Sequence, residues 1–385
     1  MTSAPERTSA YLDHGATTPV MSEVVDEMLV YLRDDFANPS GVYRAARDAR
    51  RAIDDARDVL GEAFGCASGE IVFTSGGTEA DNLAILGIER REGGRVVVSA
   101  IEHHGVLRPA ESIGATIAPV GRDGLIDLDH LAQLLDDMTD LVSVMAVNNE
   151  VGTIQPMASV IKLVNTHAPT ALIHCDAVQA LAFCDVKTLT RGCDLVSYSA
   201  HKIGGPKGVG ALVVNDRARV RLHPILRGGS QERDLRAGTE NVAGIAGFAV
   251  AVRITSQRRA ETVERVRALR DRFVDTLVHE IPGVHESVDR NLRHPGNAHL
   301  VFPEVTNEEF LLLLDRYGVA ASAGSSCASG AIEPSHVLVA MAMSPEEARS
   351  CIRFTLGQSS SGDEIDYAIA SVIAAHHQIV ASDRR

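Results

Sequence analysis

The residues best suited to chemistry begin with a lysine at the end of an apolar run. Residues 194–208 read Asp-Leu-Val-Ser-Tyr-Ser-Ala-His-Lys-Ile-Gly-Gly-Pro-Lys-Gly, so Lys202 follows a buried-strand pattern and precedes a glycine-rich turn. A poorly solvated lysine has a lowered pKa and can attack an aldehyde to form a Schiff base. Pyridoxal phosphate (PLP) is a cofactor that needs such a lysine. The alternative is an ordinary surface lysine in a polar loop.

The same arrangement, an apolar run followed by polar residues, occurs at four other places in the first half of the chain. Short apolar strands that alternate with helices predict a mostly parallel sheet. Ligands of such sheets bind beyond the carboxyl ends of the strands, so we expect the polar residues to converge there. A sixth apolar run covers 210–214. The apolar runs with polar ends are 71–73 before Thr74–Glu79, 96–98 before Ser99–His104, 141–147 before Asn148–Glu150, 171–175 before Asp176–Gln179, and 195–198 before Ser199–Lys202.

Three of these polar ends match different parts of one ligand. Gly76, Gly77 and Thr78 lie where a strand gives way to a helix, a place where backbone N–H groups bind phosphate. Asp176 closes a buried strand and could pair with a protonated ring nitrogen. His103 could lie against a flat ring and move protons. The alternatives are a tight strand–helix connection, a cap for a helix over 177–182, and a polar loop histidine.

Further candidates are amides and an arginine. Asn149 and Gln179 could donate hydrogen bonds to a phenolate oxygen, or they could satisfy loop backbone instead. Arg353 lies between the apolar residues Ile352 and Phe354. A guanidinium in that setting binds a carboxylate in a bidentate manner, either on a substrate or in a structural ion pair.

Cys327 lies in a segment, 321–331, that consists almost entirely of small residues. Such a segment would hold a thiol without burying it, which is typical of reactive cysteines. The alternative is an unremarkable loop thiol. The sequence contains no Cys-x-x-Cys pair, so we expect no metal site. The other five cysteines, at 66, 175, 184, 193 and 351, lie in apolar or helical contexts and are expected to be packing residues.

Composition limits the possible partners and locations. The 385 residues are 45% hydrophobic and 23% charged, which is typical of a folded globular protein. The net charge of −14 argues against direct nucleic-acid binding. We see no secretory signal and no apolar run long enough to span a membrane, so we expect a cytoplasmic location with reduced thiols.

The pattern changes after about residue 255, where strands and helices mix as in a smaller α+β domain. We expect a large PLP-binding domain over 14–256 and a small domain, formed by 1–13 and 257–385, that holds the cysteine segment. The elements expected in the small domain are helices over 256–280, 307–317 and 363–379 and strands over 297–302 and 350–355.

As a set, these motifs resemble the cysteine desulfurases of the NifS/IscS type, which are PLP-dependent fold-type I enzymes of the class V aminotransferase group. The matching stretches run almost from end to end in the family's order. They are YLDHGATTP (11–19), IVFTSGGTEADNLAI (71–85), EHHGVL (102–107), VNNEVGTIQP (147–156), HCDAVQA (174–180), SAHKIGGPKGVGAL (199–212), GGSQERDLRAGTEN (228–241), AGSSCASGAIEPSHVL (323–338) and IRFTLG (352–357).

The resemblance implies a role for each candidate residue. Lys202, His103 and Cys327 would be catalytic, with Lys202 bonded to the cofactor and His103 stacked on its ring. The phosphate cup would be completed by Thr239 from a partner subunit, which implies a homodimer. Asn149 and Arg353 would orient the substrate carboxylate. The remaining cofactor contacts would be Asp176 with the pyridine nitrogen, Gln179 with the phenolic oxygen, and Gly76, Gly77, Thr78, Ser199 and His201 with the phosphate.

The resemblance also implies the reaction. Cys327 would take sulfur from L-cysteine as a persulfide, leave L-alanine, and pass the sulfur to an acceptor protein for iron–sulfur assembly, tRNA thiolation or DNA phosphorothioation. The chain ends soon after the helix expected near 365–379, whereas relatives that feed an iron–sulfur scaffold often have a longer extension, so a dedicated partner in one of the other two pathways fits as well. The alternatives are a selenocysteine lyase, another PLP-dependent lyase or aminotransferase, and a non-enzymatic sulfur-relay scaffold.

Overall fold

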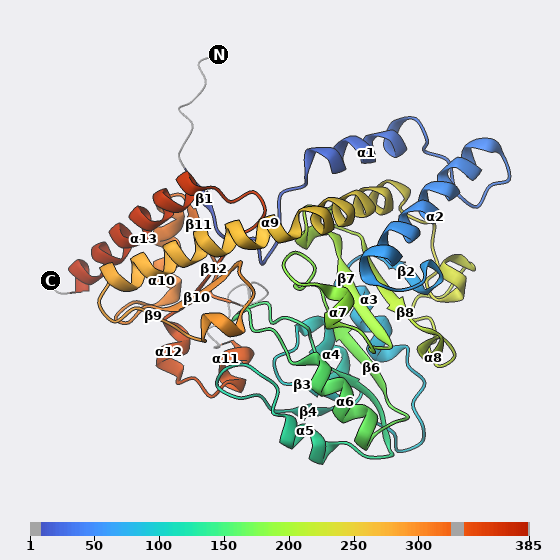
Figure 1. Ribbon diagram of the computed structural model, residues 1–385, viewed down its shortest axis with the longest axis horizontal. Coiled ribbons are helices and arrows are strands. Elements are labelled where there is room, and N and C mark those ends of the chain that lie inside the picture. Colours follow the sequence, from blue (N-terminus) through green and yellow to red (C-terminus); the bar gives the residue numbers. More distant parts are fainter. Residues whose placement is uncertain (1–8, 325–334, 384–385) are drawn as a thin grey trace.

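A seven-stranded sheet forms the centre of the computed structural model, which describes residues 9–324 and 335–383. Strand β8 is antiparallel to both of its neighbours, and the other pairs are parallel. The predicted mostly parallel sheet is therefore confirmed (Figure 1). In spatial order the strands are β2 (Ile71–Thr74), β8 (Gly210–Val214), β7 (Leu195–Ser199), β6 (Leu172–Asp176), β5 (Thr139–Ser143), β3 (Arg95–Ser99) and β4 (Thr116–Ala118).

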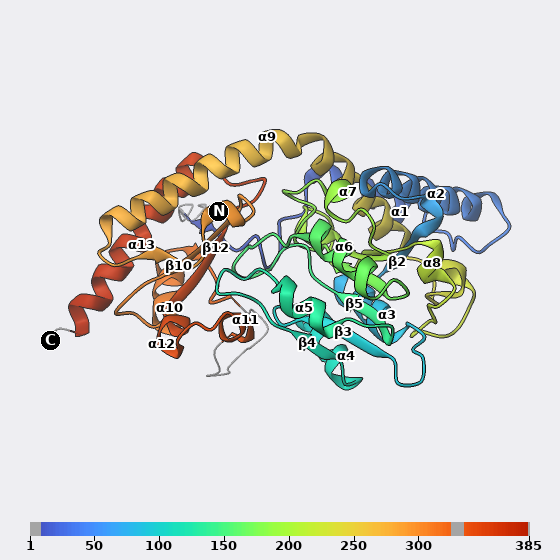
Figure 2. The same cartoon turned by 60° about the horizontal axis from the view of Figure 1, so that its bottom comes forward.

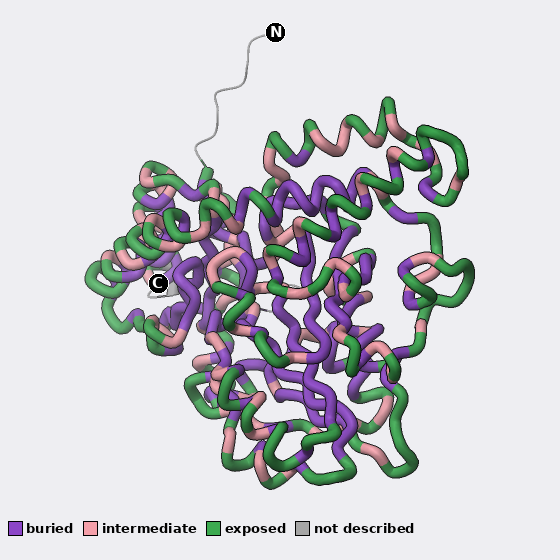
Figure 3. The backbone as a smooth tube through the Cα atoms, turned by 45° about the vertical axis from the view of Figure 1, so that its right-hand side comes forward, coloured by how far each residue is buried: buried purple, intermediate pink, exposed green. Residues whose placement is uncertain are grey.

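Both faces of this sheet are buried, which explains why its strands read as continuous apolar runs. Successive side chains point to opposite faces, so Ile71 and Phe73 belong to one hydrophobic core and Val72 to another. The tube in Figure 3 shows the strands buried inside the molecule. The first core includes residues of α1 (Ser22–Arg33), α2 (Arg44–Phe64), α5 (Leu128–Leu134), α6 (Met157–His167) and α7 (Val186–Leu189); the second includes residues of α3 (Gly77–Leu86), α4 (His104–Ser112) and α8 (Asp216–Arg219).

A separate core surrounds a smaller antiparallel sheet in the C-terminal part of the chain. Ala10 and Leu12 from the N-terminal end join this core. The division into a large and a small domain, with its boundaries, stays a prediction. The elements here are β12 (Cys351–Thr355), β10 (Asn297–Val301) and β9 (His285–Glu286), the parallel pair β1 (Ala10–Tyr11) and β11 (Val319–Ala320), and helices α10 (Asn307–Arg316), α11 (His336–Ala340), α12 (Pro345–Arg349) and α13 (Gly362–Asp383).

One 39-residue helix, α9 (Val242–Glu280), extends from the large core to the small one (Figure 2). The sequence predicted only its second half, 256–280. Residues 243–252 are buried on all sides, so this half of the helix lacks the one-sided apolar pattern that predicts a surface helix. Helix α1 packs closely on it, because a Cβ at Gly247 would lie 2.7 Å from Cγ of Met28.

Other differences from the expected elements are small. The strand expected over 141–147 ends at Ser143. Helix α3 ends at Leu86, before Gly87. Ser22 is the first residue of α1, and its hydroxyl donates to Glu23. Among the described residues, no helix is long and apolar enough to cross a membrane. The remaining short helices are η1 (Ser68–Glu70), η2 (Ala200–Lys202), η3 (Gln231–Asp234) and η4 (Arg290–Leu292).

Candidate active site

The polar residues at the strand ends do meet, at a cavity of about 240 Å³. A neighbouring cavity contains Gly76 and shares several of the same residues. The expectation that polar residues converge at the carboxyl edge of the sheet is therefore confirmed. Of the predicted site residues, the first cavity is lined by Gly77, Thr78, His103, Asn149, Asp176, Gln179, Ser199, His201, Lys202 and Arg353.

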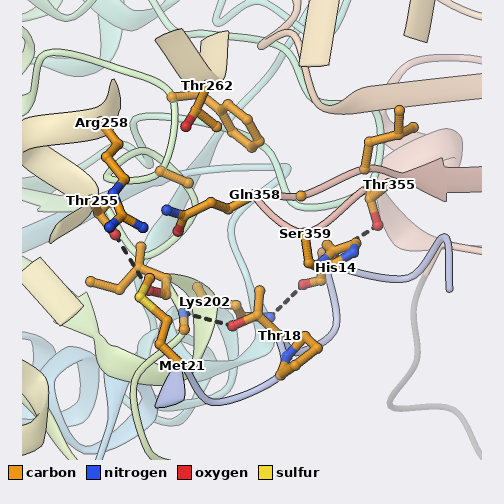
Figure 4. A pocket seen from close by; sticks show the side chains of 18 of the residues that line it. His14, Thr18, Met21, Lys202, Thr255, Arg258, Thr262, Thr355, Gln358 and Ser359 are labelled. Atoms are coloured by element: carbon orange, nitrogen blue, oxygen red, sulfur yellow. Dashed lines mark hydrogen bonds between the residues drawn. The ribbon is translucent and has the colours of Figure 1, made fainter. Parts of the chain in front are cut away.

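Lys202 lies in η2, directly after β7, and is half-buried. Its Nζ donates hydrogen bonds to the carbonyl oxygens of Gly15, at 2.5 Å, and Ala16, at 2.9 Å. The same side chain borders a second cavity of about 280 Å³, which lies between the start of α1, helix α9 and residues 355–359 (Figure 4). The side chain of Lys202 thus lines two neighbouring cavities, which excludes the alternative of an ordinary surface lysine.

Asp176 closes β6 with its side chain at the cavity. Burial raises the pKa of its carboxyl to about 6, while the Val178 N–H at 2.9 Å and the charge of Lys202 act in the opposite direction. Residues 178–183 form turns, so the alternative of a helix over 177–182 is wrong. At neutral pH this buried carboxyl is therefore mostly ionised and faces the cavity.

His103 is the N-cap residue of α4, and its Nδ1 accepts the N–H of Gly105 at 3.0 Å. Burial, followed by the charge of Lys202, lowers the pKa of this imidazole to about 4. The ring is therefore neutral at neutral pH, with its proton on Nε2 because Nδ1 is an acceptor. A neutral, buried, flat ring at the cavity can stack on a ligand and exchange a proton.

The glycine turn before α3 has the geometry of an anion site. Gly76 is the N-cap of α3 with a φ of 152°, and a Cβ at Gly77 would lie 2.7 Å from Cγ2 of Val178. Both positions therefore require glycine. Ser199 and His201 line the same cavity as this turn. Burial lowers the pKa of His201 to about 4, so this histidine would contact an anion as a neutral ring.

Arg353 forms a structural ion pair, which was one of its two expected roles, whereas substrate binding stays a prediction. Its Nη2 forms an ion pair with Oδ1 of Asp13 at 2.7 Å, and its Nη1 donates to the carbonyl oxygens of Asn149 at 2.8 Å and Gly324 at 3.0 Å. The side chain also lines the cavity. The arginine is thus fixed by the protein and still faces the candidate site.

The side chain of Gln179 donates a hydrogen bond to the carbonyl oxygen of Gly15 at 2.9 Å.

Two predicted residues lie elsewhere. Thr239 is exposed and lines neither of the two cavities that contain the other predicted residues; it borders a separate one of about 140 Å³. Cys327 lies outside the described residues. Gly324 and His336, near the two ends of the segment that includes it, both line the cavity of Lys202.

Comparison with known proteins identifies the family of the chain. The family model described as "Aminotransferase class-V" matches residues 10–368. The cysteine desulfurase IscS of Dictyoglomus turgidum is 41% identical over 367 residues, with 93% of this chain and 92% of the relative covered. That of Methanosarcina thermophila is 38% identical, with 95% and 92% covered. The chain belongs to the class-V aminotransferase family, among its cysteine desulfurases.

Solved structures of this family confirm the fold of the desulfurase. A NifS-like protein superposes with a TM-score of 0.87 at 32% identity, covering 95% of this chain and 98% of the other. The structure of DndA from Streptomyces lividans gives a TM-score of 0.76 at 34% identity, covering 89% and 98%. The resemblance inferred from the motifs is therefore confirmed.

Sequence reasoning missed several residues at the cavity of this desulfurase. Asp81 and Glu150 are buried carboxyls, and burial raises the pKa of both. Glu150 accepts a hydrogen bond from the Ser335 hydroxyl at 2.5 Å. His336 packs against His104, with ring centroids 4.5 Å apart. Asp81, Glu150 and His336 all lie within the stretches quoted above, so the motifs contained the signal, although nothing in the local sequence gave them a role.

The described cysteines of the desulfurase fit a packing role. Burial raises the pKa of the Cys66 and Cys351 thiols to about 12 and that of Cys184 to about 11. Cys175 is fully buried in the large core. Thiols held protonated in this way are poor nucleophiles.

Proposed function

We propose that this desulfurase uses PLP to convert L-cysteine to L-alanine and that Cys327 receives the sulfur as a persulfide. The observation that carries the proposal is the meeting of Lys202, Asp176 and the glycine turn at adjoining cavities. Each of these groups lies at the carboxyl end of a different strand, so only the folded sheet brings them together.

The residues present fit PLP part by part. A half-buried amine suits its aldehyde, an ionised buried carboxyl suits its ring nitrogen, and the N-terminus of α3 suits its phosphate. In this anion cradle Gly77 leaves no room for a Cβ, and Gly76 has a φ of 152° that favours glycine. We propose that Lys202, Asp176 and His103 hold the ring, with Gln179 near the phenolic oxygen. The phosphate contacts would come from Gly76, Gly77, Thr78, Ser199 and His201.

When bound, PLP supplies an electron sink that weakens bonds at the carbon atoms of the substrate. Arg353, aided by Asn149, would hold the substrate carboxylate by charge-assisted hydrogen bonds. Lys202 and the neutral His103 would accept and return protons. The Cys327 thiolate would attack the substrate sulfur. A sulfur–sulfur bond forms, the carbon–sulfur bond breaks, and its electron pair stays on the carbon, where a proton completes alanine.

The position of Thr239 supports a homodimer. This threonine is exposed and does not line the cavities of its own chain's predicted site. We propose that it completes the phosphate cup of a partner subunit. The sulfur would pass from Cys327 to an acceptor protein in the cytoplasm, and the net charge of −14 favours a protein over nucleic acid as the direct contact.

The test of the persulfide step is Cys327→Ser. We expect alanine release from L-cysteine, measured with a reductant present, to fall by at least about 100-fold, because a hydroxyl cannot accept the sulfur. Cys193→Ser, a matched change at a half-buried thiol, should keep the wild-type rate. Undiminished turnover by the Cys327 variant would exclude the persulfide step, and turnover of selenocysteine alone would favour a lyase.

A further inference from the structure

The segment that precedes Thr239 has an unusual backbone. Glu232, Arg233 and Asp234 have φ values of 48°, 55° and 66°, so three consecutive residues other than glycine are left-handed. This conformation is unfavourable for L-residues with a Cβ and persists only where the surroundings hold it. The structure therefore must contain contacts that fix residues 231–241.

The first such contact is at the free edge of the large sheet. Strand β2 is one of the two edge strands, and its backbone would be open beside Phe73. The buried Glu232 accepts the Phe73 N–H at 2.8 Å through Oε2 and forms an ion pair with the buried Arg57. Arg57 in turn donates to the carbonyl oxygen of Ile71 at 2.6 Å. An ion pair thus occupies the backbone groups that a further strand would otherwise bond.

The neighbours of Thr239 are fixed on both sides. The Gly238 N–H donates to Oε1 of Gln231 at 3.1 Å, and Glu240 pairs with Arg50 at 2.9 Å. Asn241 caps α9 by accepting the Gly244 N–H. Thr239 itself is exposed, and within residues 9–324 and 335–383 its hydroxyl makes no hydrogen bond. The segment therefore leaves Thr239 exposed, with its hydroxyl available to a partner.

A last contact connects this segment to the glycine turn before α3 of the same chain. Arg236 meets Glu79 in a two-point ion pair, with Nε 2.8 Å from Oε1 and Nη2 3.3 Å from Oε2. Glu79 also accepts the Ser75 N–H at 2.8 Å, and Ser75 begins the turn that contains Gly76 and Gly77. The hydrogen bond to Glu79 raises the pKa of Arg236, which agrees with a strong pair.

We propose that Glu232 and Arg236 are positioning residues that hold Thr239 toward the partner's cofactor site, and that the Glu79–Arg236 pair couples the two cofactor sites of the homodimer. The inference rests on the proposed function, because it needs PLP and a partner subunit. A phosphate on the turn before α3 orders Ser75 and Glu79 and, through Arg236, the segment of Thr239. Filling one site therefore preorganises the other, which is positive cooperativity.

The experiment is an equilibrium titration of the apoprotein dimer with PLP, followed by the absorbance of the bound cofactor. We expect a Hill coefficient above 1 for the wild-type protein, with a limit of 2 for two sites. Arg236→Gln should give a Hill coefficient of 1 and weaken the affinity for PLP by about 5-fold or more. Arg236→Lys, which retains a single-point pair, should restore part of the coupling. Arg349→Gln, a matched change at an exposed arginine of α12, should resemble wild type.

The outcomes separate this inference from the proposed function. A wild-type dimer that binds PLP with a Hill coefficient of 1, or an Arg236→Gln dimer that retains the cooperativity, would overturn the coupling while leaving the proposed function in place. Circular dichroism of each variant shows whether it is folded. A folded wild-type apoprotein that binds no PLP would overturn the proposed function and the coupling with it.

Discussion

Asp176 shows how the surroundings of one residue set its chemistry. A free aspartate has a pKa near 3.8, and burial in the wall of the cavity raises that of Asp176 to about 6. The folded protein therefore holds an ionised carboxylate in a place that favours the neutral form. Under the proposed function this charge would pair with the protonated ring nitrogen of PLP, so the residue would serve cofactor binding at the expense of the stability of the apoprotein.

The unfavourable burial of this ionised carboxylate predicts the effect of Asp176→Asn on stability. A folded-state pKa above the unfolded value favours folding below the unfolded pKa and disfavours it as pH rises through the folded pKa. The difference between 3.8 and about 6 corresponds to about 3 kcal/mol. The apoprotein of the variant should therefore be up to about 3 kcal/mol more stable than wild type above pH 6. Urea unfolding should show the difference at pH 8 and its loss near pH 4; equal stability at pH 8 would contradict it.

At the scale of elements, α2 and β2 provide contacts that fix residues 231–241, the segment that contains Thr239. The buried side of α2 follows a helical period, with Ile53, Leu60 and Phe64 in the large core and most of its arginines outward. Arg57 breaks this pattern because it is buried and pairs with Glu232. Its guanidinium also lies 4.7 Å from the centre of the Phe73 ring. One charged residue on the apolar side of a helix thus connects α2, β2 and the segment 231–241.

Removal of one partner of this buried pair should be costly. Glu232→Gln keeps an acceptor for the Phe73 N–H but leaves Arg57 with an uncompensated charge, so we expect a loss of about 3–5 kcal/mol in the free energy of unfolding. The matched control is Asp48→Asn, whose ion pairs with Arg44 and Arg51 on the same helix are exposed. That change should cost less than about 1 kcal/mol. Similar urea midpoints for the two variants would show that the buried pair is not needed.

At the scale of the whole molecule, the candidate site lies where distant parts of the chain meet. The ends of strands β2, β6 and β7 provide the residues proposed to bind the cofactor, and β12 of the smaller sheet provides Arg353. Helix α9 has residues in both cores and connects them directly. The exposed Thr239 extends this assembly to a second subunit under the proposed function.

Dependence on a second subunit predicts an effect of protein concentration. We expect the apoprotein to sediment as a species of twice 41.1 kDa. Dilution below the dissociation constant of the dimer should weaken the affinity for PLP, because each cup then lacks the partner's threonine. Thr239→Ala should bind PLP equally weakly at all concentrations. Sedimentation and PLP titration at matched concentrations test this, and tight binding by the monomer would refute it.

The sequence by itself determined the sheet and most of the site residues. Apolar runs buried on both faces, each followed by polar residues, are local signals, and the topology of a parallel sheet necessarily brings their ends to one edge. Lys202, Asp176, His103 and the glycine turn could therefore be found before the structure was known. The first half of α9 could not, because a helix buried on all sides has no apolar period to read.

Only the tertiary structure decided which partners these residues have. Arg353 pairs with Asp13, which lies 340 positions earlier, and Glu232 binds the backbone of Phe73 across 159 positions. Neither contact leaves a local pattern, since each depends on how separate elements pack. The same holds for the raised pKa of Asp176, because the burial that raises it outweighs the opposing N–H of Val178. Residue types and their periodicity specify the elements, whereas the packing of distant elements sets the charges and contacts of the site.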